Sequence, residues 1–147
     1  MWNEINNSND ICNFMNKICW FHDSCIKEIK YISGAYVNEE LSMYPVNSQR
    51  TLRMIIQRQF DDISMLEMEF QEIKYLKLFP SDSNYTCEIL DATLILEDGY
   101  IYWCDMGDLS LEDIKDYDGT SICAKKLRWR VIDAKYIGKN EFYLSTT

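Results

Sequence analysis

Apolar and polar positions alternate in two runs between residues 87 and 104, and Asp98-Gly99 separates the runs. An Asp-Gly pair in this setting is typical of a two-residue hairpin turn, which needs a positive φ at both positions. The turn sets the register of the predicted hairpin and places Leu94 opposite Trp103. We expect one face to form the core, with Leu90, Ala92, Leu94, Leu96, Ile101 and Trp103. The other face then carries Asp91, Thr93, Ile95, Glu97, Tyr100 and Tyr102.

The same patterns predict the elements on either side of this hairpin. Residues 8–19 show the spacing of an amphipathic helix, whose apolar stripe would be Ile11, Cys12, Met15, Ile18 and Cys19. Alternation or short apolar runs predict strands over residues 24–33, 51–60, 66–71, 74–79 and 123–133, and a short edge strand over 141–144. Ser110 and Asp113 form a capping box that predicts one or two helical turns over 110–117, whereas residues 35–49 look irregular.

Strands that follow one another as hairpins, with one helix before them and a short helix inserted, indicate an α+β fold. We expect the N-terminal helix to lie on a mainly antiparallel sheet of six to seven strands, which curls into a sandwich or a partial barrel. The chain has 147 residues, 47% of them hydrophobic, and this is the size of one ordinary domain spanning 1–147.

The N-terminal segment is polar and has neither a basic start nor a long apolar run, so we expect a cytoplasmic protein. No stretch approaches the roughly 18 apolar residues that a membrane-spanning helix needs. In a reducing compartment the six cysteines are expected to be free, buried thiols rather than disulfides. Nothing in the sequence calls for a cofactor.

The formal net charge of −9 argues against binding to nucleic acid or to anionic membranes, because both favour Lys and Arg. It is compatible with a basic protein partner, although acidity also serves solubility alone. Residues 105–118 hold six carboxylates and one lysine, a net charge of −5. As a solvated loop this segment needs no function. As a docking surface it would use Tyr100, Tyr102, Asp105, Asp108, Glu112, Asp113, Asp116 and Tyr117.

A polar cleft is the alternative hypothesis, in which a small molecule binds or reacts beside the only histidine. Its residues would be His22, Asp23, Arg128 and Arg130. Adjacent residues in the sequence do not make a catalytic triad, and the common catalytic fingerprints are absent, so an enzyme is the weaker expectation. For Arg128 and Arg130 we favour ion pairs with Glu67 and Glu69 on a neighbouring strand.

Two further hypotheses concern a metal and a second copy of the chain. Cys19, His22 and Cys25 have a spacing that would let three ligands converge on zinc, but the helix stripe already accounts for Cys19, and we expect no metal. As a homo-oligomer subunit, the protein would use the hairpin face that bears Ile95, Tyr100 and Tyr102.

Four segments resemble an uncharacterised family of small bacterial proteins, a domain of unknown function. They are FHDS (residues 21–24), QRQF (57–60), EDGYIYW (97–103) and AKKLRWRVID (124–133). The resemblance implies no activity and no site residue. Small acidic bacterial proteins are often antidotes to toxins, so by analogy we expect a non-enzymatic protein-binding module, in one form an immunity-type protein that covers a basic toxin surface.

Overall fold

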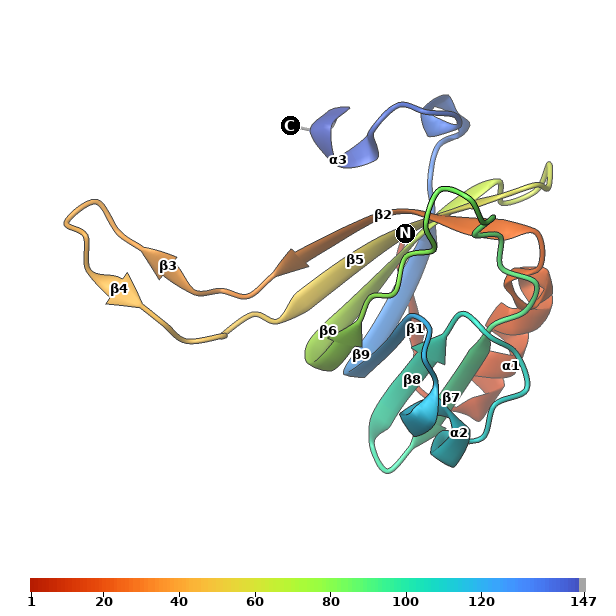
Figure 1. Ribbon diagram of the computed structural model, residues 1–147, viewed down its shortest axis with the longest axis horizontal. Coiled ribbons are helices and arrows are strands. Elements are labelled where there is room, and N and C mark those ends of the chain that lie inside the picture. The colour runs from red at the N-terminus through yellow and green to blue at the C-terminus, as the bar shows by residue number, and fades with distance from the viewer. Residues whose placement is uncertain (146–147) are drawn as a thin grey trace.

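A strongly curved antiparallel sheet forms the body of the molecule in the computed structural model, which describes residues 1–145 (Figure 1). Its strand order is β2-β5-β6-β9-β8-β7, and β1 pairs with β9. The bounds are β1 (Asn3–Ile5), β2 (Ser24–Ile32), β5 (Thr51–Arg58), β6 (Met65–Lys77), β7 (Thr93–Glu97), β8 (Tyr100–Cys104) and β9 (Ser121–Val131). The curl does not close into a barrel, because β2 and β7 remain the two edges. The expected curled α+β fold is confirmed.

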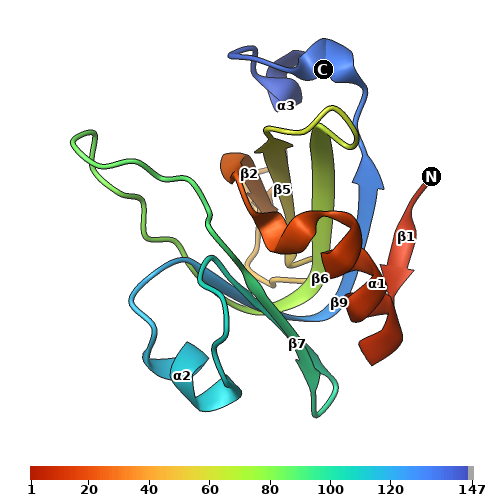
Figure 2. The ribbon, with the colours of Figure 1, turned by 90° about the vertical axis from the view of Figure 1, so that its right-hand side faces the viewer.

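Within residues 1–145, three short helices accompany the sheet: α1 (Ser8–Lys17), α2 (Leu111–Asp116) and α3 (Phe142–Ser145). Helix α1 begins where the Asn7 side chain accepts a hydrogen bond from the Asp10 N–H at 2.9 Å, and it lies across the sheet (Figure 2). Helix α2 begins at the predicted capping box, in which Ser110 and Asp113 each bond the other's backbone N–H.

The main core lies between α1 and the sheet. Ring contacts join Phe14 to Trp129 at 4.7 Å and Phe21 to Trp103 at 5.6 Å between centroids. The predicted helix stripe is right at Met15 and Ile18 but wrong at Cys12 and Cys19, which are exposed. The helix ends at Lys17, so Cys19 lies beyond its buried face. Phe14, which the predicted stripe did not include, is the largest buried side chain of the helix.

The central hairpin has the expected register, from Glu97 opposite Tyr100 to Leu94 opposite Trp103. Positive φ angles at Asp98 and Gly99, +52° and +78°, form its turn. The expected core position Leu90 is instead 64% exposed, because pairing between β7 and β8 begins only at Thr93. The second face is covered rather than open, since α2 packs Ile114 against Tyr102, Cys104 and Cys123.

Three strand predictions need correction. The two strands expected over 66–71 and 74–79 are one strand, β6, in which Glu72 has a φ of +55° and the register shifts between Ile73 and Tyr75. Strand β1 was not predicted, since its three residues show too little alternation to detect. The edge strand expected over 141–144 is the helical turn α3, because the Glu28 carboxylate accepts the Phe142 and Tyr143 N–H groups at 2.5 and 3.1 Å.

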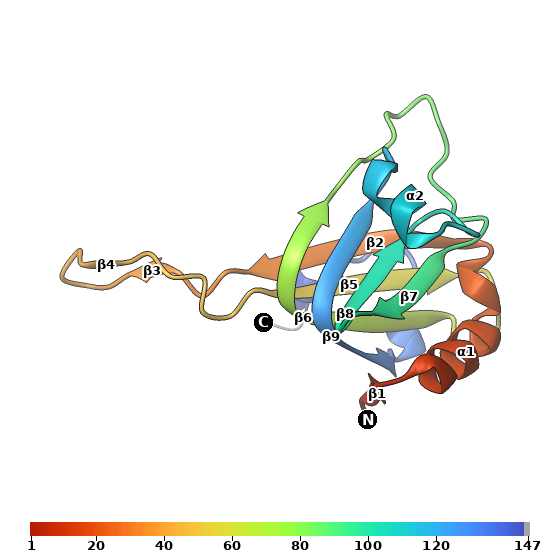
Figure 3. The same cartoon turned by 90° about the horizontal axis from the view of Figure 1, so that it is seen from below.

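Residues 35–49, expected to be irregular, belong to a long arm, residues 33–50, that projects from the body beyond β2 and β5 (Figures 1 and 3). Two short strands, β3 (Tyr36–Val37) and β4 (Met43–Tyr44), pair within it as a separate two-stranded sheet. The arm is therefore an ordered hairpin.

Candidate functional site

One wall of the candidate site is a left-handed turn, η1 (Cys19–Phe21). The φ angles of Cys19, Trp20 and Phe21 are +51°, +57° and +66°, a region that non-glycine residues rarely enter. The surrounding contacts hold this strain: Phe21 is fully buried, and the Trp20 carbonyl accepts a hydrogen bond from the Ala92 N–H at 2.9 Å. The Trp20 side chain is consequently turned outward and is 46% exposed.

The opposite wall is the loop between β8 and α2. The Thr93 hydroxyl donates to the Met106 carbonyl at 2.7 Å and accepts from the Leu109 N–H at 3.2 Å, so it fixes the loop on the start of β7. Gly107 approaches Asp91 so closely that a Cβ on Gly107 would lie 2.5 Å from the Asp91 Cβ. Only glycine permits this contact, which brings the Asp91 and Asp108 segments together.

These walls enclose a pocket of about 370 Å³, which we name the Trp20 pocket; it is lined by Trp20, Asp91, Ala92, Thr93, Leu94, Gly107 and Asp108. Asp91 and Asp108 are exposed carboxylates, and the lining contains no basic residue. An indole face attracts a cation through its quadrupole, and a carboxylate binds the same cation by a charge-assisted hydrogen bond. The pocket therefore suits the side chain of a lysine or an arginine.

The acidic residues predicted for docking divide into two groups. Asp105 accepts a short hydrogen bond from the Tyr117 hydroxyl, and burial together with this bond raises the pKa of Tyr117. Asp113 caps α2, and its hydrogen bonds with Ser110 lower its pKa. These residues hold the loop. The exposed carboxylates that remain for a partner are Asp108, Glu112 and Asp116, with Asp118 beside them.

The two predicted hairpin tyrosines are less available than the sequence suggested. Tyr102 is 9% exposed, and burial raises its pKa to about 12. Tyr100 is half-buried, with the Lys74 ammonium 4.6 Å from its ring centroid. Since α2 covers Tyr102, this face offers little surface to a second copy of the chain.

No family model, curated protein or solved structure matches this chain. The chemistry of the molecule's own surfaces is therefore the basis for inferring a function, and the family resemblance stays an expectation.

The residues of the predicted polar cleft have separate partners. The His22 Nδ1 lies 2.8 Å from the Leu90 carbonyl, and its Nε2 lies 3.4 Å from the Asp23 carboxylate. Arg130 and Arg128 instead pair with Glu67 and Glu69 at 2.7 and 2.8 Å, as the alternation predicted. Trp2 covers both guanidinium groups: its ring centroid lies 4.4 Å from the Arg128 Cζ and 4.5 Å from the Arg130 Cζ.

Glu69 lies at the centre of this ion-pair network, with only 3% of its side chain exposed. It accepts hydrogen bonds from Gln71 at 2.6 Å, from Arg128 at 2.9 Å and from Arg53 at 2.8 Å. Burial alone would raise its pKa, but the Gln71 hydrogen bond and the two arginine charges together lower it. The arginines of the predicted cleft are therefore paired with buried carboxylates.

A larger cavity of about 570 Å³ lies between β2 and the loop that connects β6 with β7. Three of its four charged groups are already engaged: Lys27 donates to the Gly138 carbonyl, Glu28 accepts from the N–H groups of α3, and Asp105 accepts from Tyr117. The fourth, Glu88, is a single exposed carboxylate, and no tryptophan lines this cavity. The Trp20 pocket, whose carboxylates face solvent, is therefore the stronger candidate.

Within residues 1–145, no three His, Cys, Asp or Glu side chains gather closely enough to hold a metal ion, and no helix has the length and apolarity to span a membrane. All six cysteines are free. Cys104 and Cys123 are buried as expected, but Cys12, Cys19 and Cys87 are exposed. The prediction that the cysteines are buried is therefore wrong for three of the six.

Three pocket residues escaped the sequence analysis: Trp20, Asp91 and Gly107. Nothing in the sequence marks Trp20, since Cys, Trp and Phe are not residues that favour a left-handed backbone. Asp91 was assigned to the second hairpin face, without a partner. The signal that did exist was Asp105-Met-Gly-Asp108, a short acidic turn directly after a strand, which led to Asp108.

Proposed function

We propose that this protein is a non-enzymatic module that binds a basic partner protein, whose lysine or arginine side chain enters the Trp20 pocket. The observation that carries the proposal is the exposed Trp20 ring beside two exposed carboxylates, Asp91 and Asp108, in a pocket without a basic group. An immunity-type protein that covers a basic toxin surface is the form that agrees with the net charge of −9.

Simple energetics support one anchored cation with weaker contacts around it. A cation over an indole ring contributes about 0.5 to 2 kcal/mol, and a hydrogen bond to a charged group about 1.5 to 3 kcal/mol. Glu112, Asp116 and Asp118 follow Asp108 along the chain and extend the negative surface. The overall charge would accelerate the encounter with a basic partner, and salt would weaken it.

The test measures binding of a labelled arginine-rich peptide to the wild-type protein and to the paired variant Asp91→Asn/Asp108→Asn. Asparagine keeps the side-chain shape and tolerates the positive φ of Asp108, +57°. Asp61→Asn/Glu141→Gln removes two exposed charges elsewhere and is the matched control. We expect the pocket variant to bind at least about tenfold more weakly and the control to change affinity less than about twofold.

Trp20→Ala gives a second measurement of the same site, because about half of its side chain is exposed and the core does not depend on it. We expect the variant to lose affinity for the peptide while its thermal unfolding remains cooperative. Equal loss of affinity in the pocket variant and the charge-matched control would show that the peptide senses only net charge, and would contradict the proposal.

A further inference from the structure

The arm, residues 33–50, carries a denser run of exposed large apolar side chains than any other part of the described chain. Its large apolar side chains are 47% to 84% exposed: Tyr36, Val37, Leu41, Met43, Tyr44 and Val46. The three clusters of buried side chains in residues 1–145 contain no residue of the arm. Contiguous exposed apolar surface of this kind marks an interaction site.

Local hydrogen bonds hold the arm in shape. At its root the Ser33 carbonyl accepts the Gln49 and Arg50 N–H groups at 2.9 and 3.1 Å. At its tip the Asn38 side chain accepts the Glu40 and Ser42 N–H groups, both at 3.0 Å.

Midway along the arm, the rings of Tyr36 and Tyr44 stack with their centroids 4.8 Å apart. Isolated two-stranded hairpins are at best marginally stable in water, so a preformed apolar arm points to a surface that covers it.

Charge is unevenly distributed along the arm. Glu39 and Glu40 make the tip acidic, and no other charged residue occurs between Ser33 and Gln49. The root is basic, because it contains Arg50. Two hydrogen bonds join Arg50 to Ile73 of β6: the Arg50 Nη1 donates to the Ile73 carbonyl at 3.2 Å, and the Arg50 carbonyl accepts the Ile73 N–H at 3.0 Å.

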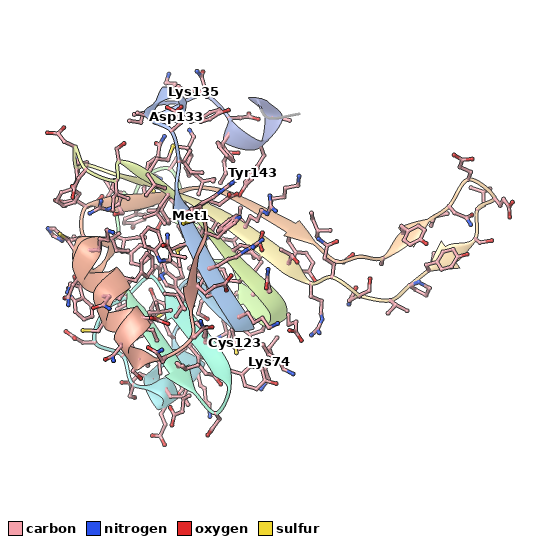
Figure 4. The ribbon with its side chains drawn as sticks, turned by 180° about the vertical axis from the view of Figure 1, so that it is seen from behind. Met1, Lys74, Cys123, Asp133, Lys135 and Tyr143 are labelled. Carbon is pink, nitrogen blue, oxygen red and sulfur yellow. The ribbon has the colours of Figure 1, made fainter. Side chains whose placement is uncertain are left out.

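Exposed lysines surround this root on the body. Ile73, to which Arg50 is bonded, pairs with Ala124 across β6 and β9. Lys74 follows Ile73 in the chain, and Lys125 and Lys126 follow Ala124. Figure 4 shows Lys74 on the body rather than on the arm. Glu72 lies within this group, with its carboxylate 3.8 Å from the Lys126 ammonium, but Arg50, Lys74, Lys125 and Lys126 outnumber it. The root thus carries a net positive charge, and the tip carries two carboxylates.

We name the paired strands β3 and β4, with Tyr36, Val37, Met43 and Tyr44, the shaft of the arm. We propose that the arm binds the arm of a second copy of this chain in the antiparallel direction, about a two-fold axis that passes between the two shafts. In this arrangement Glu39 and Glu40 of one copy meet Lys125 and Lys126 of the other, and the same contacts recur on the opposite side. A second copy fits because the charges at the two ends of one arm complement each other. The proposal does not depend on the Trp20 pocket.

Sedimentation equilibrium from low to high micromolar concentration measures the assembly. We expect a transition from the 17.5 kDa monomer to a species of twice that mass. Val37→Thr/Met43→Gln makes the shaft polar without touching the core, and it should weaken the dimer at least about tenfold. Asp61→Asn/Glu141→Gln, which changes exposed charges outside the arm, should leave it intact.

A charge exchange distinguishes this dimer from non-specific association. The variants Glu39→Lys/Glu40→Lys and Lys125→Glu/Lys126→Glu should each fail to dimerise alone, because like charges then meet twice. Mixed in equal amounts, they should form a one-to-one dimer, since the tip and root charges again match. A wild-type monomer at the highest concentration, or a mixture that does not associate, would overturn the proposal.

Discussion

Asp91 and Gly107 are in contact across the Trp20 pocket, and a Cβ added to Gly107 would come within 2.5 Å of the Asp91 Cβ. The two residues belong to segments that are 16 positions apart and that Thr93 holds together through Met106 and Leu109. The carboxylates at the mouth of the pocket owe their spacing to this contact.

Gly107→Ala is therefore expected to push the loop away from Asp91 and to destabilise the protein by about 1 to 3 kcal/mol, the usual cost of overpacking. It should also weaken peptide binding at the pocket. Denaturant unfolding and the peptide titration measure the two effects. Asp91→Gly in the same background removes the opposing Cβ and should restore most of the stability; no recovery would show that the contact is not the cause.

The buried ion pairs of Glu69 give a stability prediction. Glu69→Gln leaves Arg53 and Arg128 without their charged partner and should lower the free energy of unfolding at neutral pH by about 2 kcal/mol. The control Glu72→Gln removes a carboxylate that is 41% exposed and 3.8 Å from Lys126, and it should cost less than about 0.5 kcal/mol. Equal costs for the two variants would contradict the structural role of Glu69.

The same carboxylate predicts a pH dependence. The folded protein lowers the pKa of Glu69, so its contribution to stability is complete above the pKa of the unfolded chain, about 4.3, and is lost as the pH falls through the folded value. Unfolding measured between neutral and acid pH should show this loss in the wild type and a shallower slope in Glu69→Gln. Parallel curves would contradict it.

Thiol reactivity tests the observed burial of the cysteines. Cys12, Cys19 and Cys87 are exposed and should react with a disulfide reagent in the native protein. Cys104 and Cys123 are buried, and burial raises the pKa of both thiols, so they should react at the rate of unfolding. Mass spectrometry of the partly labelled protein identifies the sites, and early labelling of Cys104 would contradict the fold.

Much of the fold could be predicted because short-range signals determine it. The Asp98-Gly99 turn indicated the register of β7 and β8, and the alternation along two strands indicated the ion pairs of Arg128 and Arg130 with Glu69 and Glu67. Capping chemistry gave the start of α2. Each of these depends on residues that are adjacent in the chain or across one strand pair.

The rest depends on contacts that no local pattern records. Glu28 turns residues 142–145 into a helix from over a hundred residues away. Strand β1 exists because β9 offers it an edge, and Leu90 is exposed because the chain meets β2 before β7 begins. The Trp20 pocket was missed for the same reason, since Phe21, Ala92 and Gly107 create it together from three segments.

The most direct test of the proposed function is a two-dimensional amide and indole NMR spectrum recorded during titration with the arginine-rich peptide. We expect the largest shift changes at the Trp20 indole N–H and at the amides of Asp91, Gly107 and Asp108, with smaller changes along α2. Changes concentrated at Glu39 and Glu40, or spread evenly over all exposed carboxylates, would contradict a binding site at the Trp20 pocket.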